Sequence, residues 1–269
     1  MPQVTSADGT AIGYDVLHGS GPPLVLVGGG LDDGTENIPL GRWLAGTFTV
    51  VDYRRRGRGD SGDTQPYAVE REIDDLAAVI EAVGGRAHVF AASSGGTLAF
   101  EAAAAGLPID RISAHEVPYQ VGEDQVATWR TYKRDLTRAL DSGDREEAVR
   151  LFMRLAGAAD EEIAAAETLP VWPALTALAP MLRYDAACIG DGPPPADRLA
   201  KVTQPVLLTT GATIDPHSAG LATDFFAAAA DAAAAHLPNG RRAVIEVTGH
   251  VADPAVLGPI LSEFHGESP

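Results

Sequence analysis

Short apolar runs alternate with segments of helical periodicity along the first part of the chain. These runs are typical of strands and predict them at Thr10–His18, Pro23–Val27, Thr47–Tyr53, His88–Ala92 and Ile112–Val117. Between them, apolar residues recur at helical spacing and predict helices at Val69–Val83 and Ser94–Ala105. Strands that alternate with helices favour an α/β fold, in which a mostly parallel central sheet carries helices on both faces.

The pattern changes between residues 122 and 202, where strand signals disappear. Helical stretches replace them, at Val126–Leu140, Arg145–Ala156, Asp160–Thr168 and Ala174–Leu182. Alternation then resumes with a strand, a long alanine-rich helix, a strand and a last helix, at Pro205–Thr210, Ala219–His236, Arg242–Val247 and Ala255–Phe264. We therefore expect an α/β core formed by residues 1–121 and 203–269, with the helical insertion 122–202 as a lid over the carboxyl edge of the sheet.

Composition and charge narrow the classes of function. The chain has 269 residues, of which 45% are apolar, enough for a large buried core. The net charge of −17 disfavours binding to nucleic acid or to an anionic membrane surface. Cys188 is the only cysteine, which excludes an internal disulfide and a thiolate metal cluster. The first residues lack a leader pattern and no apolar run approaches the ~20 residues of a membrane span, so a cytoplasmic protein is expected.

The most informative segment is Ala91-Ala92-Ser93-Ser94-Gly95, which joins a predicted buried strand to a predicted helix. A serine on such a sharp turn has an exposed hydroxyl and a strained backbone, and the neighbours two positions away must be small. The string alone is more typical of an ordinary tight turn. Its place between a strand and a helix makes Ser93 the candidate nucleophile.

A serine hydroxyl needs a base to take its proton and an acid to orient that base. His250 is the best candidate base, because it follows the strand Arg242–Val247 and so shares the carboxyl edge of a parallel sheet with Ser93. His217 is a weaker candidate, in a loop that could approach the site. A solvated loop is nevertheless the commoner place for any single histidine.

Two carboxylates compete for the role of the acid. Glu116 ends the strand after the Ser93 helix, and Asp215 lies in the loop after Pro205–Thr210. Both lie at the expected edge, and the chain order serine, acid, histidine holds for either. Asp215 precedes a proline, where an aspartate commonly serves as a turn or helix-capping residue. A glutamate at the end of an apolar strand has fewer structural uses, and the choice stays open.

The glycine run Gly28-Gly29-Gly30 follows a predicted buried strand, where backbone N–H groups can face a cavity. The N–H groups of Gly30 and Ser94 are the expected donors to a developing oxyanion. The run does not match a nucleotide-binding loop, because it lacks the Gly-x-Gly-x-x-Gly and Gly-Lys-Ser/Thr patterns. Since no cluster of His, Asp or Glu has metal-ligand spacing, neither a cofactor nor a metal is expected.

The arginine-rich loop Arg54–Ser61 would suggest a basic patch in isolation. In this acidic chain it is flanked by Asp52, Asp60 and Asp63. We therefore predict an internally paired structural loop rather than a surface that binds anions.

Together, the glycine run, the segment Tyr53–Asp63, the serine turn, the helical insertion and the late Gly249-His250 resemble the α/β-hydrolase superfamily over nearly the whole chain. More narrowly, Pro66–Ile73 and the Ser-Ser-Gly turn are similar to a group of small bacterial hydrolases. That group has a glutamate at the position of Glu116 and a short loop without an acid where Asp215 lies. The resemblance therefore favours Glu116 as the acid, whereas Asp215 occupies the commoner position in the wider superfamily.

Three departures from that group affect the site. Ala91 stands at the first glycine of the serine turn, Val117 stands at a proline position, and Thr213–Asp224 forms a longer and different loop. The extra methyl group of Ala91 is expected to be tolerated. The longer loop is the reason that Asp215 remains a candidate beside Glu116.

The resemblance and the candidate residues predict a cofactor-free serine hydrolase acting on a small-molecule ester, lactone or thioester. Because one fold supports many reactions, a non-hydrolytic enzyme (cyclisation, acyl transfer, C–C cleavage or lyase chemistry) is the main alternative, and a non-catalytic ligand-binding protein is the third. The oligomeric state is not predicted. Six large side chains of the insertion shape the substrate pocket or form the insertion's own core: Trp129, Tyr132, Phe152, Met153, Trp172 and Met181.

Overall fold

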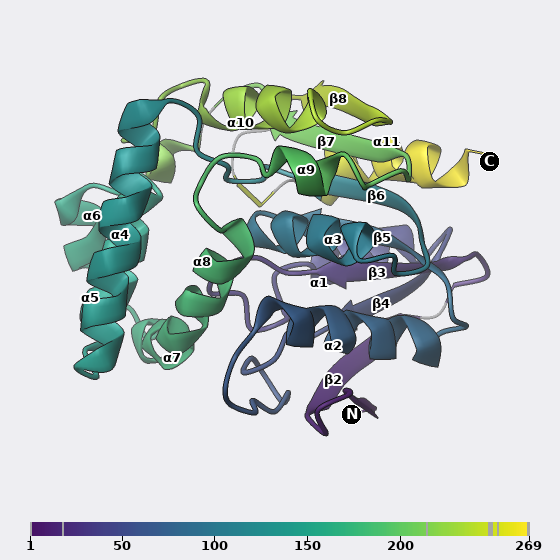
Figure 1. Ribbon diagram of the computed structural model, residues 1–269, viewed down its shortest axis with the longest axis horizontal. Helices are drawn as coiled ribbons and strands as arrows, with labels where there is room; N and C mark the ends of the chain where they lie inside the picture. Colours follow the sequence, from purple (N-terminus) through teal and green to yellow (C-terminus); the bar gives the residue numbers. More distant parts are fainter. Residues whose placement is uncertain (1, 18, 214, 247–249, 252, 268–269) are drawn as a thin grey trace.

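The computed structural model describes residues 2–17, 19–213, 215–246, 250–251 and 253–267 and contains an eight-stranded sheet (Figure 1). The strands are β1 (Gln3–Thr5), β2 (Ala11–Leu17), β3 (Pro23–Val27), β4 (Thr49–Tyr53), β5 (Ala87–Ala92), β6 (Ile109–His115), β7 (Val206–Gly211) and β8 (Gly240–Ile245). Their order across the sheet is β1-β2-β4-β3-β5-β6-β7-β8. β2 pairs antiparallel with β1 and β4, and the other neighbouring strands pair in parallel. The expected α/β fold with a mostly parallel sheet is confirmed.

The parallel register brings the carboxyl ends of the central strands to one edge of the sheet. Val27 of β3 is paired with Ala91 of β5, and Ala92 is paired with His115 of β6. His115 is paired in turn with Thr209 of β7. The chain segments that follow these strands therefore begin side by side. They include four of the sequence-predicted site segments: the glycine run, the serine turn, and the segments that carry Glu116 and Asp215.

Side chains of the central strands alternate between two buried layers. The valines of β3, Val25 and Val27, lie in a core with residues of α2 (Val69–Ala82), α3 (Ser94–Ala104) and α10 (Phe225–Ala234). The leucines of the same strand, Leu24 and Leu26, lie in a second core with residues of α1 (Ile38–Leu44) and α11 (Pro254–Gly266). Because both faces are covered, β3 and β5 are buried and apolar along nearly their whole length rather than alternating with polar residues.

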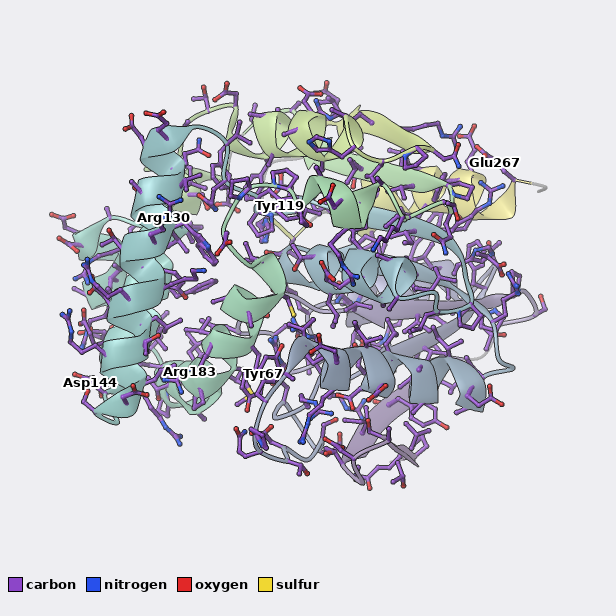
Figure 2. All side chains as sticks on the ribbon, viewed as in Figure 1. Tyr67, Tyr119, Arg130, Asp144, Arg183 and Glu267 are labelled. Atoms are coloured by element: carbon purple, nitrogen blue, oxygen red, sulfur yellow. The ribbon has the colours of Figure 1, made fainter. Side chains whose placement is uncertain are left out.

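Between β6 and β7 the regular structure is helical throughout. The helices are α4 (Glu123–Asp141), α5 (Arg145–Leu155), α6 (Asp160–Ala166), α7 (Trp172–Leu178), α8 (Leu182–Ile189) and α9 (Ala196–Leu199). We call residues 123–199 the helical segment. Figure 1 shows α4 to α7 beside the sheet, while α8 and α9 lead back to α3. The segment has a core of its own, which includes Trp129, Leu136, Val149 and Trp172. Asp144, at its outer end in Figure 2, caps α5 by accepting the Glu147 N–H at 3.0 Å.

Several predicted boundaries are corrected by the structure. β1 and α1 were not predicted, because each is too short for a clear periodic signal. β6 ends at His115, so Glu116 follows the strand instead of ending it. The helix predicted from Ala219 begins only at Phe225, because Gly220 packs its backbone against Gly157 of the helical segment and donates its N–H to the Gly157 carbonyl at 2.9 Å.

The strand predicted at 242–247 begins at Gly240, and His18, Val247 and Gly249 lie outside the described residues. In the part of the chain that the structure describes, the helices are too short or too polar to cross a membrane.

Candidate active site

Ser93 lies on the turn between β5 and α3 with φ 52° and ψ −127°, a region that side-chain-bearing residues rarely adopt. Such a conformation costs about 1–3 kcal/mol and persists only where the surroundings hold it. Here the Ser93 N–H donates to the His115 carbonyl and the Gly96 N–H donates to the Ser93 carbonyl, both at 2.9 Å. Gly95 has no room for a side chain, because a Cβ there would lie 2.6 Å from the Val27 carbonyl oxygen. The strained turn is therefore built into the packing of α3 on β3.

His250 and Glu116 form a direct pair. The Nδ1 of His250 lies 2.6 Å from Oε2 of Glu116, and the other carboxylate oxygen of Glu116 accepts the Gly211 N–H at 3.1 Å. Glu116 also has a positive φ of 50°, so the backbone leaves the extended conformation of β6 at this residue. An imidazole that donates through Nδ1 leaves Nε2 as a proton acceptor. The pair therefore has the geometry of an oriented base.

Asp215, the competing acid, contacts the backbone rather than the imidazole. Its Oδ2 accepts the backbone N–H of His250 at 3.0 Å, and its Oδ1 accepts the backbone N–H of His217 at 2.8 Å. His217 itself is exposed and lies 3.3 Å from Glu162 of α6. Within the described residues, Asp215 thus holds the loop that carries His250, and Glu116 contacts the ring.

Each member of this pair favours the charged form of the other, so the two pKa values move apart. Burial opposes the charged imidazolium, but the hydrogen bond and the negative charge of Glu116 outweigh it and raise the pKa of His250. Burial likewise opposes the Glu116 carboxylate, but the hydrogen bond from His250 lowers the pKa of Glu116. The glutamate is therefore ionised near neutral pH and stabilises a proton on the histidine.

A cavity of about 210 Å³ opens beside the pair and contains both Ser93 and His250 in its lining. Its wall also includes Gly29, Gly30 and Ser94. Most of the remaining lining is apolar and comes from the helical segment and α10: Trp129, Tyr132, Phe152, Leu155, Leu182, Ile189, Phe225 and Phe226. Of the six large side chains named in the sequence analysis, Trp129, Tyr132 and Phe152 line this cavity. Trp129 and Tyr132 also belong to the core of the helical segment, together with Trp172.

The glycine run approaches the serine turn closely. A Cβ at Gly29 would lie 2.9 Å from the Cβ of Ser93, so only a glycine allows this approach. Gly30, the predicted donor, lies next to Phe152 and the Asp185 carboxylate. Sequence reasoning missed Gly29 as a second candidate donor, although its place in the same glycine run was the available signal.

The arginine-rich loop is buried and paired, but mostly with partners far away in the sequence. Of the three flanking aspartates, Asp60 pairs with Arg54 at 2.7 Å. Arg55 pairs with Glu72 and Asp185, Arg56 with Asp75 and Asp8, and Arg58 with Asp185. The loop is internally paired, as predicted, and α2 and α8 supply carboxylate partners for these three arginines.

The chain is similar in sequence and in structure to known hydrolases. A model of the alpha/beta hydrolase family matches residues 15–257. An alpha/beta hydrolase from Sphaerobacter thermophilus DSM 20745 is 41% identical in sequence, with a TM-score of 0.85 over 98% of this chain and 100% of its own. The enol-lactonase from Burkholderia xenovorans LB400 has the same fold at 18% identity, with a TM-score of 0.70 over 99% of this chain and 100% of its own. The uncharacterized hydrolase YraK of Bacillus subtilis (strain 168) is 35% identical over 97 residues, so the match spans 35% of this chain and 35% of that relative's length.

Proposed function

The chain belongs to the α/β-hydrolase family, and we propose that it is a serine hydrolase acting on a small-molecule ester, lactone or thioester. The observation that carries the proposal is the contact of 2.6 Å between Glu116 and His250, because His250 lines the same cavity as the strained Ser93. A nucleophile, an oriented base and an ionised acid at one strand edge are the parts that acyl transfer needs.

In the proposed reaction, the Ser93 hydroxyl attacks the substrate carbonyl while Nε2 of His250 takes its proton. Glu116 stabilises the imidazolium that forms. The tetrahedral oxyanion accepts hydrogen bonds from backbone N–H groups of the glycine run and of Ser94. His250 then protonates the leaving alcohol or thiol, and the acyl group remains on Ser93. Attack by water, again with His250 as base, releases the acid and restores the serine.

The lining of the cavity supports an uncharged, apolar acyl group as substrate. The charged or chargeable side chains that line it are Glu36, Asp185 and His250, and among the described residues no lysine or arginine belongs to the wall. A substrate carboxylate buried there would lie near Glu36 and Asp185 without a lysine or arginine as partner, which is costly. We propose that residues 122–202 act as the lid that supplies this apolar wall. A cytoplasmic setting is consistent with the buried free thiol of Cys188.

Turnover of p-nitrophenyl acyl esters tests the proposal. We expect the wild type to hydrolyse them and Ser93→Ala to lose at least about 10³-fold in kcat, since removing a triad member leaves only the oxyanion hole and binding. Ser218→Ala is the matched control, because Ser218 lines the same cavity and takes no part in the proposed chemistry. Full activity in Ser93→Ala, or an equal loss in Ser218→Ala, would contradict the assignment.

A further inference from the structure

Two arginine side chains hold the carbonyl groups of the glycine run from behind. Nη1 of Arg55 donates to the Gly28 carbonyl at 3.3 Å, and Nη1 of Arg58 donates to the Gly29 carbonyl through a short contact. Both guanidinium groups are buried. Backbone carbonyls that bind buried cations cannot easily turn, so the two peptide groups of the run are fixed in orientation.

The carbonyl orientation also sets the direction of the N–H groups. In a trans peptide the C=O and the following N–H point in opposite directions, and in the described chain the single cis bond is Gln65-Pro66. The N–H groups of Gly29 and Gly30 therefore point away from the arginines. Within the described residues, neither N–H donates to a protein acceptor, and both glycines line the cavity that contains Ser93.

Asp185 of α8 holds the arginines and the serine turn together. One of its carboxylate oxygens accepts from Arg55 Nη1 at 2.7 Å, from Arg58 Nη2 at 2.8 Å and from Ser94 Oγ at 2.8 Å. Arg58 Nη2 also reaches the second oxygen at 2.9 Å. The Asp185 carboxylate thus links the Ser94 hydroxyl to the two arginines that bind the carbonyls of the glycine run.

The charges in this buried cluster balance. Glu72 of α2 binds Arg55 through both carboxylate oxygens, at 2.7 and 2.8 Å, so two arginines face two carboxylates. The Tyr67 hydroxyl donates to Glu72 at 2.9 Å. The Tyr67 ring stacks on Tyr184 of α8 with ring centroids 3.7 Å apart, and Figure 2 labels Tyr67 near α8. The cluster is therefore neutral and anchored to both the core and the helical segment, as a persistent buried ion cluster must be.

We propose that Arg58, held by Asp185, is the positioning residue of the oxyanion hole. It orients the Gly29–Gly30 peptide so that the Gly30 N–H faces the developing oxyanion, and Arg55 does the same for the Gly29 N–H. Hydrogen bonding of a guanidinium to the carbonyl also polarises the peptide and strengthens its N–H as a donor. The proposal rests on the proposed serine-hydrolase function and adds a role for the helical segment, because the hole is complete only when α8 places Asp185 against Arg58.

Arg58→Met and Arg58→Lys test this role in the full-length protein. Loss of one oxyanion donor costs about 10²–10³-fold in kcat, and a donor left free to turn is expected to cost about 10–100-fold. KM is expected to stay within about twofold, since the planar ground state depends little on the hole. Lysine is expected to restore only part of the activity, because one ammonium lacks the fork that binds both a carbonyl and a carboxylate.

The matched control is Arg56→Met. Arg56 is equally buried in the same loop, but it binds Asp75 and Asp8 and contacts no carbonyl of the glycine run. We expect it to lower thermal stability while leaving kcat per folded molecule within about twofold of wild type. Circular dichroism of each variant measures the folded fraction, and Arg58→Lys keeps the test open if Arg58→Met does not fold.

A transition-state analogue distinguishes a loss of oxyanion-hole geometry in the Arg58 variants from a general loss of structure around the cavity. An alkylboronic acid forms a tetrahedral adduct on a catalytic serine and uses the oxyanion hole, whereas an alkyl amide of the same chain length binds as a planar ground state. In folded Arg58 variants the boronate is expected to lose affinity by the same factor as kcat, with the amide affinity unchanged. Equal boronate affinity in wild type and folded Arg58 variants, or an equal loss in Arg56→Met, would overturn the role. Absence of turnover already in the wild type would overturn the proposed function instead.

Discussion

Replacing Glu116 with glutamine preserves the size of the side chain and removes its charge. The lost interaction is the one between the carboxylate and the imidazolium, which lie in direct contact at 2.6 Å. With about 4 Å between charge centres and an effective dielectric constant of about 20, this attraction amounts to about 4 kcal/mol. Since about 1.4 kcal/mol corresponds to a factor of ten, kcat is expected to fall roughly 10³-fold.

The pH profile gives a second, independent readout of the same change. Only the neutral imidazole acts as a base, so kcat/KM should rise with pH through the pKa of His250. Because Glu116 raises that pKa above its ordinary value of 6.5, the rising limb of the wild type should lie above pH 6.5. In Glu116→Gln the charge that favours the imidazolium is gone, so the limb should move to lower pH while the plateau falls.

Asp215→Asn is the control for this pair, because Asp215 binds the backbone of His250 and not its ring. Its effect on kcat should be much smaller than that of Glu116→Gln, and the rising limb should shift less. The assay is steady-state hydrolysis of an acyl ester between pH 5 and 9, with folding checked at each pH. A wild-type plateau in Glu116→Gln, or a larger loss in Asp215→Asn, would refute the assignment of the acid.

Three further predictions concern packing, substrate and pH. Gly95→Ala should destabilise the fold by roughly 1–3 kcal/mol in a denaturant titration, because its Cβ would lie 2.6 Å from the Val27 carbonyl oxygen. The control Gly46→Ala should be nearly neutral, because the nearest atom to its Cβ would be 3.7 Å away. A neutral butyrate ester should exceed the corresponding succinate half-ester in kcat/KM by at least about tenfold, since the described cavity wall has two carboxylates and no lysine or arginine. Equal rates would contradict the proposed substrate class. Burial lowers the pKa of His265 well below 6.5, so the folded state keeps this imidazole neutral. In the unfolded state it takes up a proton as the pH falls below 6.5, and the free energy of unfolding therefore decreases below that pH. His265→Gln should therefore flatten the fall in denaturation midpoint between pH 7 and 5, and an unchanged slope would count against this effect.

Much of the architecture follows from local pattern. Apolar runs such as Pro23–Val27 predict strands well, because a strand buried on both faces leaves no place for polar residues. The same logic predicts a shared strand edge for the segments that follow. It makes Ser93, Glu116 and His250 candidates from the sequence alone, and Glu116 and His250 are in contact in the structure.

The choice of acid could not be made from pattern alone. Glu116 and Asp215 follow neighbouring strands, β6 and β7, and both end within reach of the loop that carries His250. Which of them meets the ring depends on local backbone geometry, including the positive φ of Glu116, and no periodicity reports such a value.

Asp185 and the partners of the arginine loop were missed for a related reason. Asp185 lies on a helix of ordinary polarity, more than a hundred residues from Arg58, and the two meet only because α8 docks against the loop. Charge pairing is visible in a sequence when the partners are neighbours, as with Arg54 and Asp60, and invisible when tertiary packing supplies the partner.

Covalent labelling tests the central claim most directly. A fluorophosphonate reacts with a serine only where a base activates it and an oxyanion hole receives the phosphoryl oxygen. Intact-mass analysis of the labelled wild type should show one adduct, and peptide mapping should place it on Ser93, with no adduct in Ser93→Ala. An adduct on another residue, or an unlabelled and fully folded wild type, would contradict the account.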